Sequence, residues 1–296
     1  MKLSRFLFFI FLAGSCKVQY KTAYLQTNKD NNTLLWEISG NGILKPSYLF
    51  GTFHLLCKDD IHFSEPMVTA VKKVNEIYLE MDLDDPAILL SGVMLMNMNN
   101  GKRLKDIYTA EEYKKIDNFF KDSLRASLSF FQSMKPAFLE SMLYPKLLLC
   151  KTISGVEQEL MILAKNDKKE IQGLETMAFQ ASVFDSIPYA EQAKELLKTI
   201  DSLSSYKKLF DTLITVYKSQ GLDEIEKLFS KSEFGMQDNQ DILLNNRNKN
   251  WIQQLKIIMK KESVFIAVGA GHLVGGQGLI ALLRKEGYIL RPIENK

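Results

Sequence analysis

The stretch Ser47-Tyr48-Leu49-Phe50-Gly51-Thr52-Phe53-His54 is an apolar run that breaks at a glycine and then presents a histidine, one of three in the chain. The run predicts a buried strand over residues 47–53. Residues 65–74 carry apolar side chains at helical spacing, and residues 76–81 return to the pattern of a buried strand. Strand, helix and strand in succession indicate an α/β protein.

The rest of the chain extends this pattern on both sides. Further short strands are predicted at 34–39, 169–175, 264–268 and 288–293, and a last helix at 275–285. From about residue 110 to 247 the spacing is mostly helical, and one of the helices predicted there covers residues 136–150. We therefore expect one α/β domain over 34–293, with a mixed central sheet flanked by helices and a large helical insertion at about 105–260.

The N-terminus predicts export. Lys2 and Arg5 precede an apolar run that is too short to anchor the chain, and small residues lead from it to Cys16. This is typical of a signal peptide over 1–15. Residues 12–16 resemble a bacterial lipobox, which would make Cys16 a lipidated N-terminus, although ordinary cleavage after Ser15 would use the same small residues.

The polar residues 16–33 suit a tether between a lipid anchor on Cys16 and the folded body. The expected location is the bacterial periplasm or outer membrane, as a lipoprotein held to the membrane by its N-terminal lipid. Removing residues 1–15 takes two of the 38 Lys and Arg residues and none of the 35 Asp and Glu residues, which leaves 36 against 35. This balance argues against a nucleic-acid partner.

The Gly-x-x-His pattern occurs twice, each time after an apolar strand. Residues 264–268 run into Gly269-Ala270-Gly271-His272, just as the first strand runs into Gly51 and His54. Glycine lets the backbone turn sharply at a strand end, so the histidine that follows can point into the crevice where open α/β sheets bind ligands. We expect His54 and His272 to share one site.

Two carboxylates follow the same rule, because Glu80 and Glu175 each close a predicted strand. His54, His272 and Glu80, with one position left for water, are the ligand set of a hydrolytic metal centre for Mn²⁺, Co²⁺ or Zn²⁺. Glu175 is then a candidate general base or orienting group. Taken singly, a strand-end histidine or glutamate has an ordinary structural explanation; their combination points to a site.

Arg247 and the cysteines admit two interpretations each. Arg247 is either a solvated side chain beside a buried tryptophan or a guanidinium placed over the crevice as partner of an oxyanion or a carboxylate. Cys57 and Cys150 can pair in an exported protein, and sequence separation does not decide it. A metal cluster of His54, Cys57 and His62 is rejected, since the loop between them is acidic and no fourth ligand follows.

At these residues the chain resembles the TraB/GumN family, whose relatives include the Tiki proteases and, more widely, the erythromycin esterases and the haem-binding ChaN proteins. The matching pieces are Leu35-Trp36-Glu37-Ile38, Gly51-Thr52-Phe53-His54, the strand with Glu80, Gly173-Leu174-Glu175-Thr176 with Gln180, Arg247-Asn248-x2-Trp251 and Gly269-Ala270-Gly271-His272. One piece departs from the family pattern, because Glu157 stands where we expect an aspartate.

The resemblance implies an α/β core with a helical insertion, and by similarity to Tiki a divalent-metal-dependent peptidase. The residues that it carries over are His54, Glu80 and His272, with Arg247 as a weaker addition. The leading hypothesis is therefore a metal-dependent hydrolase acting on peptides or proteins. The alternatives are an esterase-like hydrolase without metal, and a non-catalytic lipoprotein that binds a peptide or haem.

Overall fold

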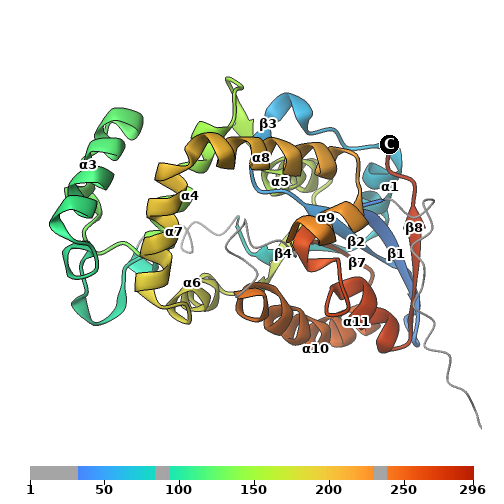
Figure 1. Cartoon of the computed structure of the whole chain (residues 1–296). Coiled ribbons are helices and arrows are strands. Elements are labelled where there is room, and N and C mark those ends of the chain that lie inside the picture. Colours follow the sequence, from blue (N-terminus) through green and yellow to red (C-terminus); the bar gives the residue numbers. More distant parts are fainter. Residues whose placement is uncertain (1–32, 84–91, 93, 230–238) are drawn as a thin grey trace, which may run out of the picture.

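The computed structural model of the chain describes residues 33–83, 92, 94–229 and 239–296 (Figure 1). The predicted signal peptide, Cys16 and the tether up to residue 32 lie outside the described residues. Within the described part, no helix has the length and apolar character needed to cross a bilayer.

The centre of the molecule is a mixed sheet, which confirms the α/β class. Its six strands follow the spatial order β6-β4-β7-β2-β1-β8, and β3 pairs with β5 in a separate small sheet. The strands are β1 (Leu35–Gly40), β2 (Ser47–Thr52), β3 (Leu56–Cys57), β4 (Glu76–Met81), β5 (Ile153–Ser154), β6 (Glu170–Glu175), β7 (Val264–Gly269) and β8 (Tyr288–Ile293).

The directions of the strands determine at which edge of the sheet the candidate site residues lie. β6, β4, β7 and β2 are parallel neighbours, whereas β1 pairs antiparallel with both β2 and β8. In the β2–β7 pair, Gly51 lies opposite Val268 and Thr52 opposite Gly269. Because these four strands run in the same direction, their carboxyl ends meet at one edge of the sheet, which is where open α/β sheets bind ligands.

The helices of the described part are α1 (Glu65–Lys73), α3 (Ala110–Leu124), α4 (Pro136–Ser141), α5 (Val156–Asn166), α6 (Met177–Asp185), α7 (Tyr189–Asp201), α8 (Leu203–Lys218), α9 (Leu222–Phe229), α10 (Asn246–Lys261) and α11 (Leu279–Lys285). Several begin at a residue whose side-chain oxygen accepts from a backbone N–H of the first turn: Ser64 for α1, Thr109 for α3 and Thr176 for α6. One turn of π-helix, Asp241–Asn245, precedes α10.

Two hydrophobic cores hold these elements. The larger one surrounds the sheet and includes buried side chains of α1, α5, α10 and α11; the strand residues Val264–Val268 are fully buried in it. The smaller core joins α3, α4 and α7 around Phe120, Leu139 and Leu196, to one side of the sheet (Figure 1). The helical material between residues 105 and 260 is therefore divided, since α5 and α10 pack on the sheet.

Two predicted helices are shorter in the structure, each for a local reason. The helix expected from 136 to 150 ends at Ser141 and gives way to a 3₁₀ turn at Tyr144–Leu147, because Pro145 has no N–H to continue the ladder. The helix expected from 275 begins at Leu279, because Gly275 has a φ of +80° and makes a turn there.

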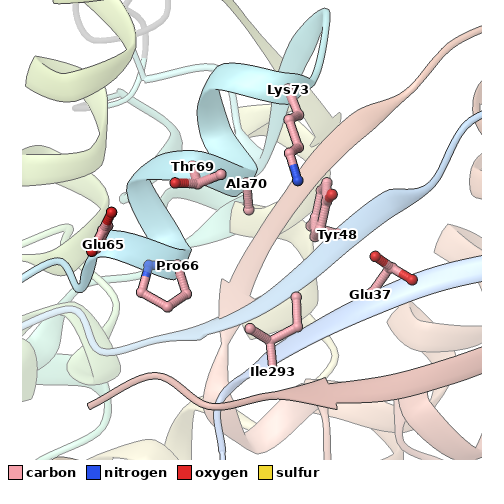
Figure 2. Close-up of a pocket in the computed structure, with 8 residues that line it drawn as sticks. All are labelled: Glu37, Tyr48, Glu65, Pro66, Thr69, Ala70, Lys73 and Ile293. Atoms are coloured by element: carbon pink, nitrogen blue, oxygen red, sulfur yellow. The ribbon is translucent and has the colours of Figure 1, made fainter.

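A cavity of about 300 Å³ lies between α1 and the strands β1 and β2 (Figure 2). It is lined by Glu37, Tyr48, Glu65, Pro66, Thr69, Ala70, Lys73 and Ile293. Tyr48 is near the amino end of β2, so this cavity is at the opposite end of the strand from His54. It contains none of the candidate site residues.

Cys57 and Cys150 form a disulfide, with Cα atoms 5.6 Å apart. The bond ties β3, just after His54, to the chain that enters β5, and β3 and β5 are themselves hydrogen-bonded. The sequence left this pairing open. Because Cys57 is committed to the disulfide, it is not available as a ligand beside His54 and His62.

Replacing both cysteines in Cys57→Ser/Cys150→Ser should lower the free energy of unfolding by about 2–4 kcal/mol, since the disulfide closes a loop of 93 residues in the unfolded chain. Urea unfolding of the variant and of the wild type measures the difference. With reducing agent present the two transitions should coincide. Equal midpoints under oxidising conditions would contradict the pairing.

Candidate functional site

The four candidate side chains come from four neighbouring strand ends. His54 is two residues beyond β2, and His272 is three residues beyond β7. Glu80 is the second-last residue of β4, and Glu175 is the last residue of β6. Since β4, β7 and β2 are adjacent and parallel, their side chains are brought to one place.

Gly269 marks the point where three of them converge. A Cβ added there would lie 3.3 Å from Glu80 Oε1, 3.7 Å from His54 Nε2 and 3.7 Å from His272 Cδ2. The distance between His54 Nε2 and His272 Cδ2 is therefore at most twice 3.7 Å. The two imidazole rings, which come from distant parts of the chain, lie close together as the sequence predicts. The absence of a side chain at Gly269 leaves this space open.

Glu80 is held by three donors. Its Oε1 accepts from the backbone N–H of Gly269 at 2.8 Å, and its Oε2 accepts from Arg247 Nη2 at 2.7 Å and from Gln180 Nε2 at 3.2 Å. Burial alone would raise the pKa of this carboxyl group, but the basic groups of His272, Arg247 and His54 hold it well below its usual range. Glu80 is therefore an ionised, fixed carboxylate.

Arg247 is buried rather than solvated, with 7% of its surface exposed. Its Nε and Nη2 bind Glu175 at 2.8 to 3.1 Å, and Nη2 also binds Glu80. Nη1 donates to the carbonyl of Leu243 at 3.0 Å in the π-helical turn, and the guanidinium lies over the ring of Trp251. The structure thus places Arg247 as a carboxylate partner.

Glu175 meets the rest of the site through this guanidinium. Its side chain is 3% exposed, and its hydrogen bonds go to Arg247. Burial raises the pKa of the Glu175 carboxyl, against the opposing effect of Arg247. Of the two carboxylates on Arg247, Glu175 is therefore the weaker acid.

His54 is anchored by Glu157, to which the sequence analysis assigns no role. Its Nδ1 lies 2.8 Å from Glu157 Oε1, which also accepts from the hydroxyl of Thr52 at 2.5 Å. The His54 side chain is 67% exposed, and the charge of Glu157 raises its pKa to about 9. Within the described structure, no hydrogen bond of His54 Nε2 is found.

Glu157 reaches His54 because α5 begins very close to the end of β2. A Cβ on Gly155 would meet the His54 carbonyl oxygen at 2.6 Å, so only glycine allows this approach. The backbone N–H of Val156 then donates to the carbonyl of Phe53. The sequence signal for this contact is Gly155-Val156-Glu157, in which a glutamate stands where the family pattern predicts an aspartate.

His272 has a different environment, with 3% of its surface exposed. Its Nδ1 lies 2.7 Å from Asn248 Oδ1, its Nε2 lies 3.2 Å from Arg247 Nη1, and its ring packs on Trp251 with 4.4 Å between centroids. Burial lowers the pKa of His272 to about 3. At neutral pH the two histidines therefore differ in charge: His54 is cationic and His272 is neutral.

Two histidines and a glutamate are ligand types that bind divalent cations, but their present positions do not form a complete coordination sphere. Among the described residues, no three His, Cys, Asp or Glu side chains are set as a metal cluster. Both histidines have Nδ1 bound to a neighbouring oxygen, so a ligand would bind at Nε2, which in His272 now faces Arg247 Nη1 at 3.2 Å. Glu80 Oε1, 3.7 Å from His272 Nε2, adds a carboxylate oxygen.

Two curated proteins are distant relatives of this chain. Metalloprotease TIKI2 of Danio rerio is 21% identical over 88% of this chain, which spans 61% of that protein's length. Metalloprotease TIKI1 of Xenopus tropicalis is 26% identical over 43% of the chain and 22% of its own length. No solved structure matches.

A family model describes nearly the whole folded body. The model of the TraB/PrgY/gumN family matches residues 34–292, a span that runs from β1 to the last strand and contains every strand end described above. The chain belongs to the TraB/PrgY/gumN family.

Proposed function

We propose that this protein is a hydrolase that cleaves peptide bonds, with its reaction centre at the space beside Gly269. The observation that carries the proposal is the convergence of His54, Glu80 and His272 on that space, at the carboxyl edge of parallel strands. The two metalloproteases among its relatives support the choice of reaction.

The proposed cofactor is Mn²⁺, Co²⁺ or Zn²⁺, held by His54 Nε2, His272 Nε2 and Glu80. Such an ion would polarise the scissile carbonyl and lower the pKa of a bound water. His54 would give up its Nε2 proton to bind it, while Glu157 keeps the ring oriented through Nδ1. The exposed side chain of His54 supports a substrate approach from that side.

Glu80 and Glu175 are assigned different roles in the proposed reaction. Arg247 keeps Glu80 ionised, so Glu80 is suited to bind a cation and is a poor base. Glu175 has the raised pKa of a group that can accept a proton, and we assign it the role of general base. Arg247 orients both carboxylates by donating to them at once.

A hydrolase without metal is the second candidate, and one contact favours it. Arg247 Nη1 faces the Nε2 atom of His272 at 3.2 Å, which uses the lone pair that a metal would need. In that case His54, once its Nε2 proton is lost, would activate water directly and the glutamates would orient it.

The disulfide supports the proposed location. Disulfides persist in oxidising compartments, so the Cys57–Cys150 bond favours an exported protein. We propose that Cys16 carries a lipid that holds the protein at the bacterial periplasmic or outer membrane, where it acts on peptide or protein substrates.

The proposed reaction is tested with a peptide library and the matched variants Gly269→Ala and Gly276→Ala. A methyl at 269 would enter the space shared by the candidate donors, whereas one at 276 would meet no atom within 4 Å. We expect wild type and Gly276→Ala to cleave peptides equally and Gly269→Ala to lose at least about 100-fold in kcat/KM, because a 1 Å misplacement alone costs that much.

Circular dichroism and thermal melting establish that both variants fold. Chelation should abolish wild-type turnover, and Mn²⁺, Co²⁺ or Zn²⁺ should restore it; turnover that resists chelation selects the metal-free hydrolase. If wild type binds peptides without cutting any, or if Gly269→Ala remains fully active, the proposed site is wrong.

The pKa of His54 gives a separate test in metal-free protein. The pKa of its ring should be about 9 by NMR, and Glu157→Gln should lower it toward the ordinary histidine value of 6.5 by removing the neighbouring charge. Because the pKa is raised on folding, the pair stabilises the fold fully below about pH 6.5 and the contribution is lost as pH rises through about 9.

The stability of Glu157→Gln should depend less on pH between 6.5 and 9 than that of wild type. Coincident His54 curves in the two proteins would show that Glu157 does not control this ring.

A further inference from the structure

Asn248 is a buried side chain next to the site whose role the proposed reaction leaves open. It follows Arg247 on α10 and is 1% exposed. Its amide has three partners: the ring of His272, the backbone carbonyl of His272 and the backbone carbonyl of Gln277. Every one of these contacts constrains which end of the amide faces which partner.

The two carbonyl oxygens fix the orientation of the amide. Carbonyl groups only accept hydrogen bonds, so the group that faces Gln277 O at 2.9 Å and His272 O at 3.3 Å must be the Nδ2 donor. The opposite orientation would set Oδ1 against two buried acceptors. Asn248 Oδ1 is therefore the atom that lies 2.7 Å from His272 Nδ1.

That orientation determines where the imidazole proton is. An amide oxygen cannot donate, so Nδ1 must carry the proton, and in a neutral ring Nε2 is then the acceptor. Arg247 leads to the same tautomer independently, because its Nη1 only donates and lies 3.2 Å from Nε2.

We propose that Asn248 is a positioning residue, which holds His272 in the tautomer with the proton on Nδ1 and so presents the lone pair of Nε2 to the site. The tautomer follows from the hydrogen bonds alone. Its consequence for turnover rests on the proposed function, since a metal ligand or a base needs that lone pair.

The comparison with His54 shows why an amide stands at this position. Glu157 also accepts from a histidine Nδ1, but it is a charged carboxylate and favours the protonated ring of an exposed histidine. Asn248 supplies the same acceptor without a charge, beside a ring that is 3% exposed. The neutral acceptor fixes the tautomer and leaves the buried ring uncharged.

The test is ¹⁵N NMR of the histidine rings in metal-free, full-length protein. The chain has three histidines, so selective labelling gives three ring systems that single substitutions assign. We expect a pyrrole-type shift at His272 Nδ1 and a pyridine-type shift at Nε2. Asn248→Asp keeps an oxygen acceptor and should keep the Nδ1 proton. In Asn248→Ala only Arg247 still favours this tautomer, so both shifts should move part of the way toward averaged values.

Asn250→Ala, an exposed position on the same helix, is the matched control and should leave the His272 shifts unchanged. A wild-type ring with its proton on Nε2 would overturn the proposal. So would an Asn248→Ala ring with unchanged shifts. If Asn248→Ala does not fold, the wild-type and Asn248→Asp spectra still decide the tautomer.

Activity provides the second readout. We expect Asn248→Ala to lower kcat about 10–100-fold with KM little changed, the usual size of an effect exerted through the partner of a metal-binding histidine. An inactive wild type that shows the expected ring shifts would refute the hydrolase but not the role of Asn248. An active wild type in which His272 carries its proton on Nε2 would refute the role of Asn248 but not the hydrolase.

Discussion

The guanidinium of Arg247 is the interaction on which the site depends. It uses all five N–H groups: for Glu175, for Glu80, for the carbonyl of Leu243 and toward His272 Nε2. Two buried carboxylates at one edge of a sheet would repel each other and lack solvation, so they require a buried cation between them. Removing one partner of such a buried pair costs about 3–5 kcal/mol.

The sheet topology and this ion network support each other. β7 lies between β4 and β2, so the turn after β7 brings Gly269 and His272 between Glu80 and His54. The backbone N–H of Gly269 donates to Glu80, which links the end of one strand to the side chain of its neighbour. The π-helical turn before α10 places the Leu243 carbonyl against Arg247, in keeping with the frequent occurrence of such turns at functional sites.

The sequence predicted the parts of the site that depend on strand ends. Apolar runs, glycines and parallel strand direction are local features, and they were enough to bring His54, His272 and Glu80 together. The partners of these residues were not predictable in the same way. Arg247 and Asn248 reach the site from a helix, and their burial is set by packing on Trp251 and the sheet rather than by spacing. The disulfide likewise depends on a distance through space between Cys57 and Cys150.

We propose that the space beside Gly269 is a reaction centre that holds a cation between two histidines and a glutamate. A crystal of the protein soaked with Zn²⁺ or Mn²⁺, with anomalous diffraction measured at the absorption edge of the metal, tests this most directly. We expect one anomalous peak at about 2.0–2.3 Å from His54 Nε2, His272 Nε2 and a Glu80 oxygen. A peak elsewhere with this space filled by Arg247, or rings turned away from each other, would contradict it.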